Sequence, residues 1–155
     1  MNSKTGLVLI CLAAAAFAFA ACERSAKSGH GLILPEGDIG QGKAAFVKLG
    51  CIQCHTVKSV GLPAFEGETT FMLELGGEVL KVKTYGDLVT SIINPDHVIS
   101  PQYLSQLPTG SLAESPMTDL TREMTVSEMV DLVTFLHSRY IKKPRPDYRS
   151  FDLYP

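Results

Sequence analysis

The sequence has few cysteines, no tryptophan and little net charge of either sign. Four of its 155 residues are cysteine, none is tryptophan, and the formal net charge is −2. A chain this close to neutral lacks the basic excess with which proteins bind nucleic acid, so we expect no nucleic-acid partner. Without tryptophan, a domain of this size has limited apolar surface to bury. Length and composition together predict one globular domain.

An uncharged stretch from Leu7 to Ala21 follows a short polar start with Lys4. It is too short to span a membrane comfortably and ends in small residues, so residues 1–21 are predicted to be an export signal. The signal ends Phe19-Ala20-Ala21-Cys22, which resembles the lipobox of bacterial lipoproteins. That resemblance implies a periplasmic protein that is anchored to a membrane by lipid on Cys22. Ordinary signal cleavage after Ala18-Phe19-Ala20 is the alternative.

Two of the cysteines, Cys51 and Cys54, stand in the stretch "GCIQCHTV". A C-x-x-C pair followed directly by histidine is typical of covalent attachment of c-type haem. Two thiols three positions apart on one helical turn can both form thioether bonds to a haem edge, while the next residue, His55, faces the iron. We therefore predict one covalent haem c, with His55 as the proximal iron ligand.

Two other chemistries use a C-x-x-C pair. Tetrahedral zinc needs four ligands, and neither a second C-x-x-C nor a closely spaced histidine pair follows in this sequence. A thioredoxin-type redox pair would lie in a βαβ pattern, which the sequence lacks. A disulfide is not expected either, because Cys11 would leave with the signal and Cys22 would take lipid.

The rest of the chain divides into a tether, a domain and a tail. Residues 22–37 are rich in small polar residues and predict a flexible tether, and the Pro-rich residues 141–155 predict an extended tail. Within the domain, the stretch Phe71 to Val82 alternates apolar and polar residues around Gly76-Gly77, which predicts a small β-hairpin. Residues 95–120 predict a loop. Capping patterns and apolar periodicity predict three helices. The first begins at Asp38-x-x-Gln41 and ends at Gly50, and the second begins at Thr84-x-x-Asp87 and ends at Asn94. The third begins at Thr125-x-x-Glu128 and runs to Tyr140.

The stretches "DIGQGKAAFVKLGCIQCHT" and "MTVSEMVDLVTFLHSRY", with a methionine in the loop between them, resemble the class I, mitochondrial-type c cytochromes. The resemblance covers residues 38–140 and implies an all-α fold, with three main helices around one haem and the hairpin as a small insertion. In that family a glycine and an aromatic residue of the first helix cross the last helix closely. Gly42, Phe46 and Phe135-Leu136 match that pattern.

The distal iron ligand is predicted to be Met117. The ligand must come from a loop that leaves the second helix, wraps the far face of the haem and enters the last helix. Met117 lies in such a segment, "AESPMTDL", where the proline limits the backbone and can hold the sulfur against the iron. The main alternatives for this role are His97 and Met124, and Met72 and Met129 also compete for it.

A haem iron held by histidine and methionine has no free coordination position, so the remaining chemistry is one-electron transfer. We expect an electron carrier and not an enzyme, with a periplasmic redox protein or oxidoreductase as its partner. One alternative is the haem c subunit of a periplasmic oxidoreductase complex, for example for sulfur-compound oxidation. Another is a haem sensor or catalyst whose sixth iron position is open. Polar side chains that could bond the haem propionates are Tyr85 and Arg122, with Lys81, Lys83 and Tyr103 as further candidates.

Overall fold

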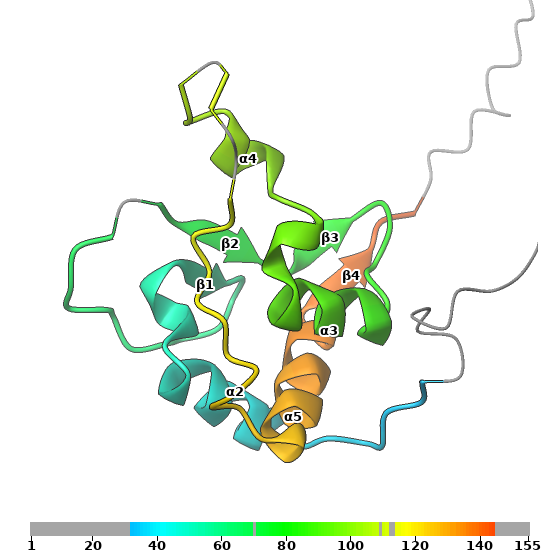
Figure 1. The fold of residues 1–155 in the computed structure, drawn as a ribbon. Helices are drawn as coiled ribbons and strands as arrows, with labels where there is room; N and C mark the ends of the chain where they lie inside the picture. The colour runs from blue at the N-terminus through cyan, green and yellow to red at the C-terminus, as the bar shows by residue number, and fades with distance from the viewer. Residues whose placement is uncertain (1–31, 70, 109, 112–113, 145–155) are drawn as a thin grey trace, which may run out of the picture. The chain divides into compact units, whose positions relative to one another are not determined.

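The computed structural model describes residues 32–69, 71–108, 110–111 and 114–144. The predicted signal, residues 22–31 of the tether with Cys22, and residues 145–155 of the tail lie outside the described residues. The elements below all belong to the unit Ile33–Pro155. Along the chain they are α2 (Ile39–Lys48), the 3₁₀ turn η1 (Cys51–Gln53), β1 (His55–Val57), β2 (Leu73–Leu75), β3 (Gly77–Val79), α3 (Tyr85–Ile93), the 3₁₀ turn η2 (Pro95–His97), α4 (Pro101–Leu104), α5 (Val126–His137) and β4 (Tyr140–Lys142) (Figure 1).

The three longer helices begin where the capping patterns predict. The Asp38 carboxylate accepts a hydrogen bond from the Gln41 backbone N–H at 2.7 Å and so caps α2. The helices α3 and α5 each open with a complete capping box, from Thr84 and Thr125 respectively. The end of α5 lies earlier than predicted, because Tyr140 belongs to the strand β4.

The helices α2 and α5 cross at close range (Figure 1). At Gly42 a Cβ atom would lie 2.1 Å from the Asp131 carbonyl oxygen, so only glycine permits this approach. One turn further along α2, the ring of Phe46 packs edge to face on that of Phe135. This is the helix pairing that Gly42, Phe46 and Phe135 predict. The buried cluster around it comprises Phe46, Val57, Leu88, Val89, Ile92, Leu132, Val133, Phe135 and Leu136.

The prediction of an all-α fold is wrong. Within the described residues, four α-helices are accompanied by two small parallel sheets, so the architecture mixes helix and strand. In the first sheet β1 pairs with β2, with His55 opposite Leu73. In the second sheet β3 pairs with β4, with Gly77 opposite Tyr140. The strand β4 lies in the segment that follows α5. The local sequence pattern of this segment does not distinguish a strand from an extended tail.

The predicted hairpin between Phe71 and Val82 is also wrong. The strands β2 and β3 follow each other along the chain but pair with β1 and β4 instead of with each other. A tight hairpin needs two turn residues, whereas Gly76 alone separates these strands. Gly76 and Gly77 have φ angles of 85° and 81°. The bend at these two residues directs β2 toward β1 and β3 toward β4. After the bend, the Gly77 N–H donates to the Arg139 carbonyl oxygen at 2.9 Å. The predicted loop 95–120 differs from expectation as well, because it contains η2 and α4.

Candidate functional site

The C-x-x-C-H motif lies directly after α2. Gly50 has a φ angle of 73°, a left-handed conformation that ends the helix and turns the chain. Cys51 then opens η1, Cys54 follows its last residue, and His55 begins β1. Both cysteines are free and half-buried. The helix end and the short turn therefore place two thiols and an imidazole on one compact stretch of backbone.

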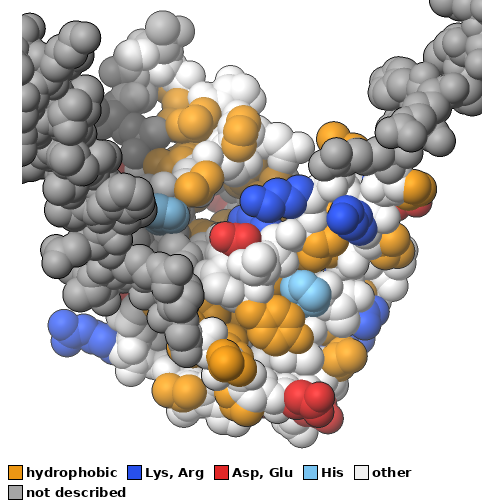
Figure 2. Space-filling model, turned by 90° about the vertical axis from the view of Figure 1, so that its right-hand side faces the viewer, with side chains coloured by type: hydrophobic (Ala, Val, Ile, Leu, Met, Phe, Trp, Pro, Cys, Tyr) orange, Lys and Arg blue, Asp and Glu red, His pale blue; other side chains and the backbone are white. Residues whose placement is uncertain are grey.

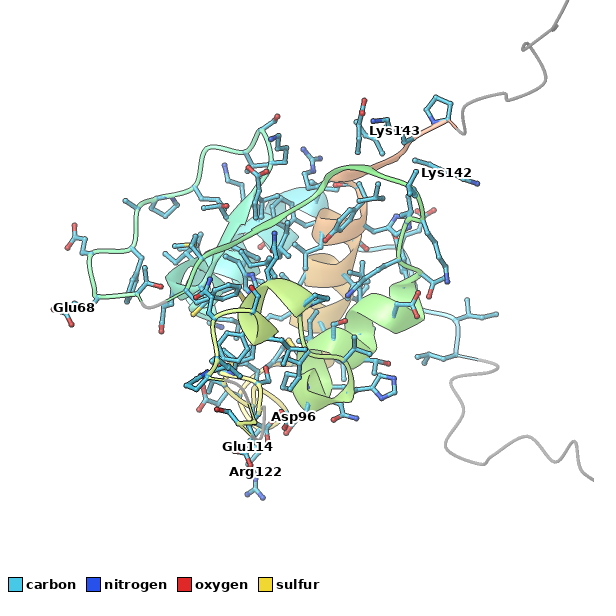
Figure 3. The ribbon with its side chains drawn as sticks, turned by 90° about the horizontal axis from the view of Figure 1, so that it is seen from above. Glu68, Asp96, Glu114, Arg122, Lys142 and Lys143 are labelled. Atoms are coloured by element: carbon cyan, nitrogen blue, oxygen red, sulfur yellow. The ribbon has the colours of Figure 1, made fainter. Side chains whose placement is uncertain are left out.

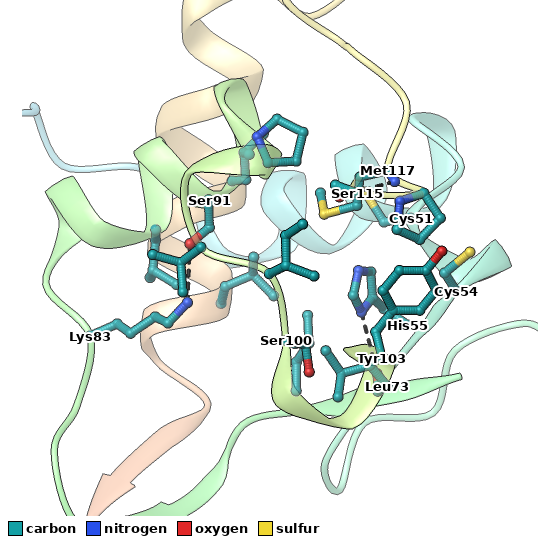
Figure 4. Close-up of a pocket in the computed structure, with 18 of the residues that line it drawn as sticks. Cys51, Cys54, His55, Leu73, Lys83, Ser91, Ser100, Tyr103, Ser115 and Met117 are labelled. Carbon is teal, nitrogen blue, oxygen red and sulfur yellow. Dashed lines mark hydrogen bonds between the residues drawn. The ribbon is translucent and has the colours of Figure 1, made fainter. Parts of the chain in front are cut away.

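A cavity of about 420 Å³ opens beside this motif, and Cys51, Cys54 and His55 all line it (Figure 4). Its size lies within the range of pockets that hold small molecules and cofactors. The walls are mostly apolar and come from α2, α3, α5 and the segments around them. Six of the apolar side chains on these walls are Phe46, Phe71, Leu88, Ile92, Leu132 and Leu136.

His55 is oriented by the pairing of β1 with β2. Its Nδ1 atom lies 3.3 Å from the Leu73 carbonyl oxygen, to which it can donate a hydrogen bond. The other ring nitrogen points into the cavity (Figure 4). Burial lowers the pKa of His55 below its ordinary value, which favours the neutral imidazole. A neutral imidazole held at Nδ1 by a carbonyl is the form in which histidine binds a metal through Nε2.

Met117 lines the same cavity as His55 (Figure 4). Of the methionine and histidine side chains in the described ranges, these two alone do so. Met124 and Met129 pack against the buried cluster, His97 is exposed, and the Met72 side chain is 44% exposed. The structure thus brings the predicted distal ligand to the cavity and leaves its four competitors elsewhere.

The propionate candidates separate into two groups. Lys83 and Tyr103 line the cavity, whereas Lys81, Tyr85 and Arg122 do not. The Tyr85 ring packs on His137 with centroids 4.7 Å apart. Arg122 points away from the domain (Figure 3). The structure therefore gives no support to a cofactor contact by Tyr85 or Arg122.

Lys83 lies on the side of the cavity away from Cys51 and Cys54 (Figure 4). Its Nζ atom donates to the Ser91 hydroxyl at 3.0 Å, and that hydroxyl donates to the Asp87 carbonyl oxygen at 2.8 Å. The cavity thus has two thiols at one end and an ammonium group at the other.

The thiol of Cys51 differs from that of a redox-active cysteine. Burial raises its pKa to about 11, so the thiol stays protonated at neutral pH. Redox-active C-x-x-C pairs instead rely on a thiol whose pKa is lowered. Among the described residues, the motif included, no group of three or more Cys, His, Asp and Glu side chains is arranged to hold a metal ion.

Sequence reasoning missed several polar residues around the cavity. Ser91, Ser115 and Glu74 line it, and Asp96 bonds to the backbone of Ser115. A signal existed for Asp96, because an aspartate after Asn94-Pro95 is typical of turns in which the side chain accepts a backbone N–H. Its partner, however, is 19 positions away in the chain.

Comparisons with protein-family models, with curated proteins and with solved structures find no match to this chain. In the described part of the chain, no helix combines the length and apolar character needed to cross a membrane. The motif and the geometry of the cavity are therefore the features that indicate a function.

Proposed function

We propose that this chain is a c-type cytochrome that carries one covalent haem, attached to Cys51 and Cys54, and that it transfers single electrons. His55 and Met117 are the proposed axial ligands of the iron. One observation carries the proposal: these four side chains line one cavity, although Met117 is remote from the motif in sequence.

The residues of the cavity fit such a group. Two thiols stand at one end, an imidazole nitrogen points inward, and a thioether lies on the same cavity, which is the donor set of a histidine–methionine haem site (Figure 4). The apolar walls suit a flat, mostly apolar macrocycle and exclude water. The two free thiols would form thioether bonds to the vinyl groups of a haem held in this cavity.

When bound, a haem supplies one-electron redox chemistry. The chain's own residues would set the conditions for it. Leu73 holds His55 through Nδ1 and keeps Nε2 aimed into the cavity. The Met117 thioether would favour ferrous iron and raise the reduction potential. With both axial positions filled by the chain, a substrate has no place on the iron, which supports a carrier and not an enzyme.

Lys83 is the residue best placed to meet the haem propionates, whereas Tyr103 lies on the side of Cys54 (Figure 4). The propionates lie on the haem edge away from the vinyl groups, and Lys83 lies on the side of the cavity away from the two cysteines (Figure 4). An ammonium group is a strong donor to a carboxylate.

We also propose that the protein works in the periplasm, attached to a membrane by lipid on Cys22, and that it exchanges electrons with a periplasmic redox protein or oxidoreductase. The lipobox-like sequence supports the anchor. The face formed by α3, β3 and β4 carries basic side chains beside exposed apolar ones (Figure 2), a mixture suited to transient docking. A subunit of an oxidoreductase complex, for example for sulfur-compound oxidation, is the alternative, and co-purification of a second chain would identify it.

The test is to express the full chain in a bacterial host that attaches c-type haem. Haem that stays with the protein on a denaturing gel is expected for wild type and for Cys22→Ser, but not for the double variant Cys51→Ser/Cys54→Ser. Cys22→Ser should also move from the membrane fraction to the soluble fraction. A wild-type protein without covalent haem would overturn the proposal, and a wild type found wholly in the soluble fraction would overturn the anchor alone.

A spectrum of the wild-type protein then separates the carrier from a sensor or catalyst. A carrier with both axial positions filled should not bind carbon monoxide in the ferrous state. A ferrous protein that binds carbon monoxide readily would support the open-position alternative.

A further inference from the structure

The segment that carries Met117 is fastened to η2 by a short chain of hydrogen bonds. An Asp96 carboxylate oxygen accepts from the Ser115 backbone N–H at 2.6 Å. The Ser115 hydroxyl in turn accepts from the Met117 backbone N–H at 3.3 Å.

This attachment stands out because the segment has little other support. Residues 114–118 belong to no helix or strand. Among the hydrogen bonds of the described residues, the Asp96 bond is the one that joins residues 114–118 to another element. The Pro116 ring fixes one backbone angle next to Met117 but supplies no donor. The position of the Met117 backbone relative to the cavity thus depends on Asp96.

Asp96 itself stands on a firm base. Pro95 opens η2 directly after α3, and the His97 N–H donates back to the Asn94 carbonyl oxygen at 3.0 Å. The helix α3 contributes Leu88, Val89 and Ile92 to the buried cluster. The Asp96 carboxylate therefore lies just after a helix that is packed in the core. Its hydrogen bond to Ser115 attaches the loop that contains Met117 to this helix.

We propose that Asp96 is a positioning residue for Met117: its carboxylate holds the loop so that the thioether stays within reach of the iron. This inference rests on the proposed function, because it assumes that Met117 is the distal ligand. Without the Asp96 bond, the loop gains conformational freedom, and the thioether must lose that freedom again each time it binds. A competing ligand would then displace Met117 more easily.

The reduction potential distinguishes this role from a simple charge effect. Removal of a negative charge near the site would by itself stabilise the reduced, less positive iron and raise the potential. Loss of the thioether ligand lowers the potential. Asp96→Ala is therefore expected to lower it, while Asp96→Asn, which keeps an oxygen acceptor without the charge, should leave it unchanged or slightly higher.

The experiment compares haem-loaded variants of the full chain, with imidazole as the competing ligand of the ferric protein. Asp96→Ala should weaken the far-red sulfur-to-iron charge-transfer band and raise the affinity for imidazole roughly tenfold, the scale of one hydrogen bond to a charged acceptor. Asp96→Asn should restore both properties. Asp119→Ala is the matched control, since Asp119 accepts from the Thr121 N–H at 2.9 Å within the same loop and this bond does not join the loop to another element. Asp96→Gly gives a second version of the truncation if Asp96→Ala does not accumulate.

Failure of this inference can be separated from failure of the proposed function. If Met117→Ala abolishes the band while Asp96→Ala and Asp96→Gly keep wild-type band intensity and imidazole affinity, the positioning role is overturned and the ligand assignment stands. If Asp119→Ala matches Asp96→Ala, the effect belongs to the loop in general, and the role of Asp96 is overturned. If wild-type protein lacks the band, the ligand assignment fails and this inference fails with it.

Discussion

The rings of Phe46 and Phe135 meet edge to face, with centroids 5.9 Å apart and planes inclined at 68°. This contact lies where α2 crosses α5, one turn from Gly42. The same two helices frame the cavity, since α2 ends just before Cys51 and α5 supplies Leu132 to the wall. The helix crossing therefore decides where the motif lies relative to the rest of the site.

The first prediction concerns the close approach at Gly42. Gly42→Ala should lower the free energy of unfolding by about 1–3 kcal/mol, the usual cost of forcing extra atoms into a packed contact. The added methyl group would meet the Asp131 backbone at 2.1 Å, and backbone cannot move aside as a flexible side chain can. Chemical denaturation of haem-loaded protein measures the change.

Gly86→Ala is the matched control for that substitution. Gly86 is an exposed glycine of α3, and the nearest atom to an added Cβ would be the Thr84 hydroxyl oxygen at 3.8 Å. Alanine there should be neutral or stabilise by up to ~1 kcal/mol, because glycine is a poor helix former. Equal destabilisation by both variants would contradict the importance of the crossing.

The parts of the fold that the sequence predicts are those decided by neighbouring residues. Helix starts at Thr84 and Thr125 depend on contacts within four residues, and so they can be identified from spacing. The sheets depend on partners far along the chain. The segment around Gly76-Gly77 has the composition of a hairpin, but its partners are β1 and β4, which local patterns do not reveal.

The site follows the same division. Cys51, Cys54 and His55 belong to one short motif, so they can be identified together from the sequence. Sequence spacing does not give side-chain direction, so it favours Tyr85, whose ring turns to His137, over Lys83, which lines the cavity. The link from Asp96 to Ser115 is a tertiary contact that only the folded chain reveals.

The second prediction concerns acid stability. The Glu128 carboxylate accepts a hydrogen bond from the Lys48 ammonium group of α2 at 2.6 Å and also caps α5. The Lys48 bond is the largest of the interactions that lower the pKa of Glu128 from 4.5 to about 2. Because the folded-state pKa is lowered, the stabilisation is fully present above pH 4.5 and is lost as the pH falls through about 2. Glu128→Gln should therefore be less stable than wild type at neutral pH, with a difference that shrinks toward pH 2.

Denaturation at a series of pH values between neutral and 2 tests this expectation. Glu123→Gln, at an exposed position before the same helix, serves as the control for the loss of one carboxylate. A Glu128→Gln difference that does not change with pH would show that the ionised carboxylate is not the source of the stabilisation.

The third prediction concerns Lys83 and rests on the proposed function. Lys83→Met should lower the reduction potential, because a positive charge near the haem favours the reduced, less positive iron. Lys81→Met is the control, since Lys81 is exposed and does not line the cavity. Redox titration of the three proteins at low ionic strength, where charge effects are largest, measures the difference. Equal shifts in both variants would assign the effect to general surface charge and remove Lys83 from the site.

The last prediction tests the distal ligand directly. Met117→Ala should abolish the far-red charge-transfer band of the ferric protein, open the ferrous iron to carbon monoxide and lower the potential, because the thioether is the group that fills the sixth position. Met124→Ala removes a methionine that packs on the buried cluster outside the cavity, so it should cost stability and leave all three properties unchanged. Absorption spectra of ferric and ferrous protein, recorded with and without carbon monoxide, give the comparison. A Met117→Ala protein with the wild-type ferric spectrum would remove Met117 as the ligand, and loss of the band in Met124→Ala instead would require the loop to approach the haem in another arrangement.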